Sequence, residues 1–140
     1  MIGGNLEFSC GDDRYVRPAP VVRGVKVTCA SSGSTDKRDW DALVDTGADA
    51  TVIPEDVVKA LGMVPYDHIG AKGFDRGGMA PAPKRPMFHV ELDVPGLGKV
   101  PLNPISAKRS SVLLGRDFLG KLMLLMEARV AKWAAGTSPW

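Results

Sequence analysis

Residues 42–53, with the sequence ALVDTGADATVI, constrain the fold more than any other segment of the chain. An apolar run leads directly into Asp45, the chain turns at Thr46 and Gly47, and a second apolar run leaves the turn. Gly47 lets the backbone approach its neighbours closely, and the Thr46 hydroxyl can hydrogen-bond within the loop. Because Asp, Thr and Gly are all common in turns, the tripeptide alone favours a structural turn. The segment predicts two short strands joined by a tight loop that carries a carboxylate.

The other apolar runs are also short and indicate strands. Residues 88–94 alternate between apolar and polar side chains, which is the period-two pattern of a strand with one buried face. The polar residues 31–39 lie between two apolar runs and predict a hairpin loop. Pro101 and Pro104 favour an edge position for the strand that contains them. We predict strands at residues 21–29, 40–44, 50–53, 88–94, 100–105 and 111–114.

Two segments predict short helices. Pro54 suits the first position of a helix, the acidic residues 55–56 suit its first turn, and Gly62 is a stop signal, so a helix of about two turns is expected. Residues 116–122 predict a second short helix. The apolar residues 123–126 that follow either extend this helix or form a final strand, and the sequence leaves both alternatives open.

Residues 69–86 are dense in glycine and proline. This composition excludes a regular helix and predicts an excursion from the fold, such as a hairpin with a flexible tip. The segment is the best candidate for a lid over a binding site.

The composition fits one folded domain of 140 residues, because 44% hydrophobic residues are too many for a disordered chain. The 18 basic and 16 acidic residues are interspersed, so no basic patch for nucleic acid stands out. The longest apolar run, residues 122–126, is too short to span a bilayer, and the N-terminus lacks the apolar run of a signal peptide. We expect a cytoplasmic protein that binds neither nucleic acid nor membrane.

The cysteines and histidines do not indicate a bound group. Cys10 and Cys29 lie far apart in sequence and form no disulfide framework, so free thiols in a reducing compartment are expected. His68 and His89 are isolated from other metal-ligating residues, so surface or strand-face positions are expected for both. The sequence implies no metal and no cofactor.

Two segments resemble those of a known family. Residues 42–53 resemble the active-site segment of retropepsins, the retroviral-type aspartic peptidases, in which an apolar run precedes Asp-Thr-Gly-Ala. Residues 112–119, VLLGRDFL, resemble the late motif of the same family, and the glycine-rich stretch at 74–79 lies where the family has its flap. The resemblance covers residues 21–126.

The resemblance implies an all-β fold, a mainly antiparallel closed β-barrel with one or two short helices. It implies a protease domain at residues 21–128, with an N-terminal arm at 1–20 and a C-terminal tail at 129–140. In viral members the two chain ends interleave in a small sheet that holds the dimer, and the arm and tail of this chain differ from those ends.

The resemblance also implies roles for single residues. Asp45 would be the catalytic carboxylate, and Thr46 would reach across to its counterpart in a second copy. Asp49 and Arg116 match positions that pair in the family, where a bidentate contact would brace the active-site loop against the late helix. The residues that would support the active-site loop are Thr46, Gly47, Ala48, Asp49 and Arg116. The flap over the substrate would comprise Gly73, Phe74, Asp75, Arg76, Gly77, Gly78 and Met79.

Peptide hydrolysis by this chemistry needs two carboxylates that share one proton, because one acts as a base toward water while the other acts as an acid toward the scissile carbonyl. The chain has a single Asp-Thr-Gly, so a symmetric homodimer would supply the second Asp45. The resemblance therefore implies an aspartic endopeptidase that cleaves an extended peptide or protein substrate. Two alternatives stay open: a retropepsin-fold module that binds peptides or dimerises with little turnover, and a maturation enzyme within a larger polyprotein.

Overall fold

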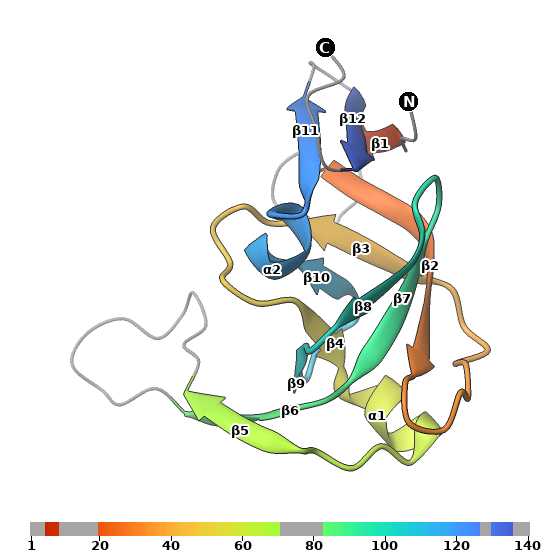
Figure 1. Ribbon diagram of the computed structural model, residues 1–140, viewed down its shortest axis with the longest axis vertical. Coiled ribbons are helices and arrows are strands. Elements are labelled where there is room, and N and C mark those ends of the chain that lie inside the picture. Colours follow the sequence, from red (N-terminus) through yellow and green to blue (C-terminus); the bar gives the residue numbers. More distant parts are fainter. Residues whose placement is uncertain (1–4, 9–19, 71–82, 127–129, 136–140) are drawn as a thin grey trace.

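The computed structural model describes residues 5–8, 20–70, 83–126 and 130–135 (Figure 1). The strands are β1 (Asn5–Phe8), β2 (Pro20–Cys29), β3 (Trp40–Val44), β4 (Val52–Pro54), β5 (Asp67–Gly70), β6 (Lys84–Met87), β7 (Val90–Val94), β8 (Gly98–Leu102), β9 (Ile105–Ala107), β10 (Val112–Leu114), β11 (Leu122–Met126) and β12 (Val130–Ala135). The helices are α1 (Glu55–Leu61) and α2 (Arg116–Leu119). A mostly β fold with short helices is therefore confirmed. Neither helix of this described part is long and apolar enough to cross a membrane.

The strands form one extended sheet in the order β11-β12-β1-β2-β3-β10-β4-β9-β6-β5, with β7 paired to β2 and β8 paired to β7. Most pairs are antiparallel, whereas β10 with β3 and β4 with β9 are parallel. Figure 1 shows β11, β12 and β1 at one end of the molecule and the β5–β6 hairpin at the other. Within the described residues β11 and β5 do not pair, so the predicted closed barrel is not confirmed.

Strand β2 changes partner along its length. Its first half pairs with β3 and its second half with β7, and the register is irregular between Val22 and Val25. Gly24 lies at this irregularity with a φ of 75°, a conformation that residues with a Cβ rarely adopt. The bulge therefore lets one strand take part in two ladders.

The hydrophobic core confirms the period-two prediction for residues 88–94. Phe88 and the three valine and leucine positions of β7 at 90, 92 and 94 are buried, whereas Asp93 is exposed. The strands and helices around them contribute further buried side chains, which include Val25, Val27, Ala42, Ile53, Val57, Val112, Leu114 and Phe118. The core thus draws on both parallel pairs and both helices.

Helix α1 lies where its start and stop signals predict. The acidic residues Glu55 and Asp56 occupy its first turn, and Gly62 ends it in the left-handed conformation with a φ of 59°. The sequence predicts Pro54 as the first helical residue, and this prediction is wrong. Pro54 is instead the N-cap, with extended dihedral angles. The reason is its place in β4, where it pairs with Ala107 of β9.

The predicted strand at residues 100–105 is instead two strands with different neighbours. β8 pairs with β7, whereas β9 pairs with β4 and β6. Pro104, which has no N–H to donate to a ladder, lies in the break between them. β8 has no second neighbour among the described strands, so the predicted edge position is confirmed for Pro101.

Residues 122–126 form strand β11, which decides between the two alternatives that the sequence leaves open. The predicted arm and tail also contain strands. β12 lies within residues 129–140 and pairs with β11, and β1 lies within residues 1–20 and pairs with both β12 and β2. These pairs join the described parts of both end segments to the sheet.

Arg38 anchors the loop that follows β2. Its guanidinium donates hydrogen bonds to Asp36 at 2.9 and 3.2 Å, lies 4.6 Å from the ring centroid of Trp40, and reaches the Asp56 carbonyl oxygen at 3.2 Å. Asp36 is 4% exposed. Burial raises the pKa of Asp36, but the hydrogen bonds and charge of Arg38 outweigh this effect and lower the pKa overall.

Replacing Arg38 with Met should lower the free energy of unfolding, because it leaves the buried carboxylate of Asp36 without its charged partner. The pKa of Asp36 is depressed in the folded chain, so its contribution is present above the unfolded-state pKa of about 4 and is lost as the pH falls through the folded-state pKa. Urea denaturation at neutral and acidic pH checks this expectation.

The difference between wild type and Arg38→Met should shrink toward acidic pH. Lys37→Met removes an exposed charge next to it and should change stability by no more than about 0.5 kcal/mol at neutral pH. Equal losses in the two variants would contradict the role of the Asp36 contact.

Candidate active site

The parallel pair of β3 and β10 brings the two predicted motifs together. Val44 pairs with Leu114, and the Asp45 N–H donates to the Leu114 carbonyl oxygen at 3.0 Å. Because parallel strands end at the same edge of a sheet, Asp45 and Gly115 leave the sheet side by side. The Asp-Thr-Gly loop and helix α2 therefore lie next to each other although about 70 residues of sequence separate them.

The loop that carries Asp45 is a tight turn. The Gly47 N–H donates to Oδ1 of Asp45 at 2.9 Å, and the Ala48 N–H donates to the Asp45 carbonyl oxygen at 3.2 Å. A Cβ on Gly47 would lie 3.2 Å from Asp45 Oδ1, so a larger residue would crowd the carboxylate. Asp45 is half-buried and Thr46 is exposed. Oδ2 of Asp45 accepts no hydrogen bond from the described residues.

Main-chain hydrogen bonds hold the loop against α2. The Arg116 N–H donates to the Ala48 carbonyl oxygen at 2.8 Å, and the Asp117 N–H donates to the Asp49 carbonyl oxygen at 3.3 Å. Arg116 and Asp49 also form an ion pair through Arg116 Nη2 and Asp49 Oδ1. Their side chains are 58% and 87% exposed, so the pair contributes at most about 1 kcal/mol.

A hydrogen-bonded contact between the buried Thr51 and the half-buried Asp117 is the stronger connection, and it is not among the predictions from the sequence. Oδ1 of Asp117 accepts hydrogen bonds from the Thr51 N–H at 2.9 Å, from Thr51 Oγ1 at 2.7 Å and from the Phe118 N–H at 2.8 Å. Thr51 Oγ1 in turn accepts from the Gly115 N–H at 3.2 Å. Thr51 is fully buried, and a polar residue within the apolar run of residues 50–53 is the signal that points to such a partner.

Gly115 allows this contact because no larger residue fits at its position. A Cβ there would lie 2.5 Å from the carbonyl carbon and 2.6 Å from the carbonyl oxygen of Ala50. Since both atoms belong to the backbone, a side chain would force the loop and α2 apart. The glycine of the late motif is therefore required by packing.

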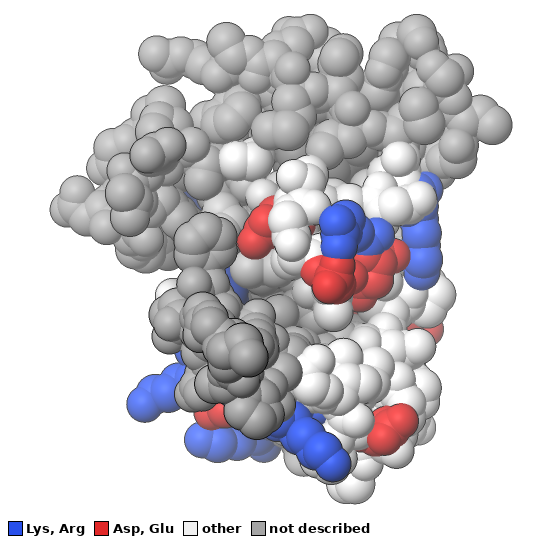
Figure 2. Space-filling model, turned by 90° about the vertical axis from the view of Figure 1, so that its left-hand side faces the viewer, with Lys and Arg blue, Asp and Glu red and all other residues white. Residues whose placement is uncertain are grey.

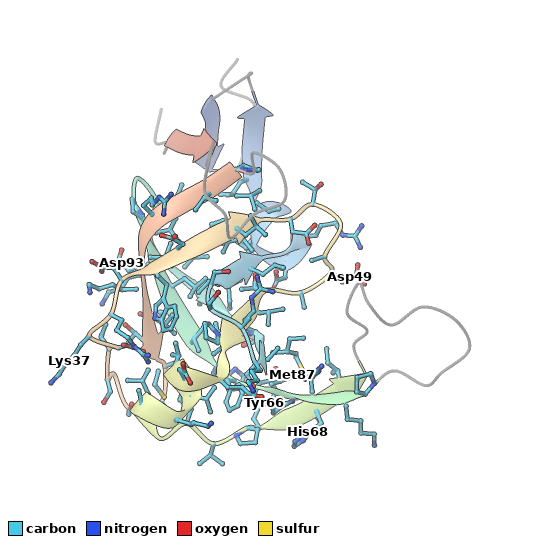
Figure 3. All side chains as sticks on the ribbon, turned by 180° about the vertical axis from the view of Figure 1, so that it is seen from behind. Lys37, Asp49, Tyr66, His68, Met87 and Asp93 are labelled. Atoms are coloured by element: carbon cyan, nitrogen blue, oxygen red, sulfur yellow. The ribbon has the colours of Figure 1, made fainter. Side chains whose placement is uncertain are left out.

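In Figure 1 the β3–β4 loop and the β5–β6 hairpin project to the left, and Figure 2 shows the molecule from that side. Acidic and basic side chains touch near the middle of this face, and further basic side chains gather along its lower part. Figure 3 shows Asp49 at the outside of the loop, in agreement with its exposure. The loop is thus open to solvent along its outer side.

The predicted flap, residues 73–79, lies wholly outside the described residues, which exclude 71–82. Its arms are described, and they confirm the hairpin: β5 and β6 are antiparallel, with Gly70 opposite Lys84 and Asp67 opposite Met87. The flap residues that lie outside the described ranges are Gly73, Phe74, Asp75, Arg76, Gly77, Gly78 and Met79.

The described residues contain no group of three or more His, Cys, Asp or Glu side chains that could hold a metal ion. His68 is exposed on β5 (Figure 3). His89 stacks on Tyr66, with ring centroids 3.8 Å apart, and its Nδ1 lies 2.7 Å from Asn103 Oδ1. Both histidines are exposed, as the sequence predicts.

Replacing Thr51 with Val should lower the free energy of unfolding by about 1–3 kcal/mol, because the isosteric side chain leaves Asp117 Oδ1 and the Gly115 N–H each with one hydrogen bond fewer. Amide hydrogen exchange at Gly115 should become faster. Thr51→Ser keeps the hydroxyl and should retain slow exchange, although loss of the methyl group costs about 1 kcal/mol. Unchanged exchange in Thr51→Val would refute this bracing role.

Comparisons with known proteins give no family model and no curated protein that matches this chain. Solved structures do match it. A retropepsin-like aspartic protease from Rickettsia conorii has a TM-score of 0.55 and 12% identity, over 95% of this chain and 94% of that one. The solution structure of simian foamy virus (mac) protease has a TM-score of 0.50 and 16% identity, over 71% and 91%.

A foamy viral protease-reverse transcriptase in complex with an RNA/DNA hybrid has a TM-score of 0.51 and 18% identity. The match covers 71% of this chain and only 12% of that longer one. At these identities the similarity concerns the fold. The chain has a retropepsin-like fold.

Proposed function

We propose that this chain is one half of an aspartic endopeptidase in which two copies each contribute Asp45 to a shared site. The observation that carries the proposal is the tight turn that holds Asp45 at the end of β3 in a retropepsin-like fold. Asp45 Oδ1 accepts a hydrogen bond from the Gly47 N–H, and Asp45 Oδ2 has no hydrogen-bond partner within the described residues. Such a carboxylate can bind and activate a water molecule.

Two copies are needed because the reaction uses an acid and a base at the same time. The sequence contains one Asp-Thr-Gly and no Asp-Ser-Gly, so one chain supplies one such carboxylate. Two carboxyl groups about 3 Å apart cannot both ionise, as is known for aspartic proteases in general, and the pair then holds one proton. The ionised Asp45 takes a proton from water, while the protonated Asp45 of the second copy donates one to the scissile carbonyl oxygen.

The sheet offers an edge at which a second copy can pair. β11 stands at one end of the strand order and has only β12 as a neighbour among the described strands. Its sequence, LMLLM, has no charge and no proline to prevent edge pairing. It directly follows α2, which contacts the Asp45 loop, so pairing at this edge is compatible with two Asp45 loops meeting on a two-fold axis.

The substrate in this proposal is an extended peptide or protein segment that crosses the two loops. Thr46 and Gly47 contact the second copy and the substrate, while Ala48, Asp49 and Arg116 keep the loop in place. Residues 73–79, which lie between β5 and β6 in the sequence, are the proposed flap that covers the substrate and excludes water.

Replacing Asp45 with Asn should lower the rate of peptide hydrolysis by roughly 10²–10⁴-fold or more, because the shared proton and the general base are lost. Mass spectrometry of an unfolded protein substrate, incubated from acidic to neutral pH, measures the cleavage. Asp93→Asn changes an exposed carboxylate on β7 and is the matched control, with no expected loss. Cleavage that persists in Asp45→Asn would reject the mechanism.

The same assay separates the peptidase from a module that binds peptides without turnover. Such a module would bind extended peptides equally well in the wild type and in the Asp45→Asn variant, and would cleave none of them. Inhibition of wild-type cleavage by a transition-state analogue of aspartic peptidases would favour the enzyme.

Specific activity should fall when the protein is diluted through the dissociation constant of the dimer, because a single copy lacks the second carboxylate. Activity per mole of chain and sedimentation velocity would be measured on the same dilution series. The two curves should coincide. Constant specific activity in a preparation that sediments as a monomer would contradict the shared site.

A further inference from the structure

A pocket lies where the end of the Asp45 loop, the ends of β6 and β8, and α2 meet. Its volume is about 410 Å³, within the range of roughly 300–1,000 Å³ that is typical of ligand pockets. The side chains that matter for its chemistry are Ala50, Met87, Leu102, Asp117 and Lys121. Figure 3 shows Met87, close to Tyr66, at the inner end of the β5–β6 hairpin.

The pocket is within reach of a peptide that lies across Asp45. Ala50 follows Asp45 by five residues, a length of chain that spans at most about 18 Å. An extended peptide rises about 3.3 Å per residue, so a side chain within about six residues of the scissile bond can reach Ala50. Asp117, which lines the pocket, also accepts the hydrogen bonds that hold Thr51. The same residue therefore lines the pocket and supports the Asp45 loop.

Of the charged side chains that line the pocket, Lys121 has donor groups and Asp117 an acceptor atom that are incompletely used. Lys121 Nζ donates to the Pro101 carbonyl oxygen at 3.2 Å, which leaves two of its three N–H groups for a ligand. Asp117 Oδ1 accepts three hydrogen bonds, whereas Asp117 Oδ2 accepts none within the described residues. Met87 and Leu102 supply apolar surface beside these groups.

We propose that this pocket binds a carboxamide side chain, glutamine or asparagine, of the peptide that Asp45 cleaves, and so sets a sequence preference away from the scissile bond. The carboxamide oxygen accepts from Lys121, and its NH₂ group donates to Asp117 Oδ2. The methylene groups of the side chain pack on Met87 and Leu102. The inference rests on the proposed function for the path of the peptide past Ala50.

The two opposite charges explain why a carboxamide fits better than a charged side chain. A glutamate side chain meets Lys121 favourably but is repelled by Asp117, and a lysine side chain has the reverse problem. A carboxamide is neutral and carries both a donor and an acceptor, so it satisfies both groups at once. A hydrogen bond to a charged group accounts for about a ten-fold difference in affinity.

The test uses the full-length Asp45→Asn protein, so that binding is measured without cleavage. An array of decapeptides is probed in which each position is occupied in turn by Gln, Asn, Glu, Lys or Ala. At one position Gln or Asn should bind about ten-fold more tightly than Glu, Lys or Ala. Adding Lys121→Met should reduce this preference to about two-fold or less, and Lys121→Arg, which keeps the donors, should retain part of it.

Lys59→Met removes an exposed charge on α1 and is the matched control, with no expected change in preference. Thermal denaturation of each variant checks that it is folded. The proposal is overturned if no position prefers a carboxamide, or if the preference survives Lys121→Met. A carboxamide preference that depends on Lys121, in a protein whose wild type cleaves none of the peptides, would support the pocket and reject the peptidase.

Discussion

The hydrogen bonds between the buried Thr51 and the half-buried Asp117 are the contact on which the candidate site depends. They connect the strand that leaves the Asp45 loop to the helix that follows β10, and Gly115 permits the close approach that they require. A buried hydroxyl is costly without a partner, so the hydrogen bond to Asp117 holds Thr51 in one geometry. The exposed pair of Asp49 and Arg116 lies over the same junction but is screened by water. The interior contact therefore does more to fix the loop than the surface one.

This junction explains how a small fold can present a carboxylate with restricted motion. Asp45 is held from one side by the Gly47 N–H and from the other by the bond from its own N–H to β10. General acid–base chemistry depends on such positioning more than on any unusual local charge. In the peptidase that we propose, one chain lacks the second carboxylate. Symmetry is the simplest source of it, because a two-fold axis duplicates the loop without any new sequence.

The neighbouring pocket, which we propose as a recognition site for a peptide side chain, is lined by a residue that also holds the Asp45 loop. Asp117 uses one carboxylate oxygen to hold the loop and leaves the other for the pocket that it lines together with Lys121. A ligand bound there would contact the group that positions the Asp45 loop, so recognition and loop geometry are coupled through one side chain.

The amino-acid sequence was sufficient to predict the local structure and the candidate carboxylate. The alternation at residues 88–94, the cap signals around α1 and the Asp-Thr-Gly segment act over a few residues, and strands, helix and loop lie where they predict. Other features depend on residues far away in the sequence, and only the packed chain decided them. They include the break between β8 and β9 at Pro104, the choice of strand for β11, and the lack of pairing between β11 and β5. The hydrogen bond between Thr51 and Asp117, which are 66 residues apart, is a further example. Local propensities fix dihedral angles within a segment, whereas hydrogen-bond partners between strands and buried polar contacts exist only after the chain has packed.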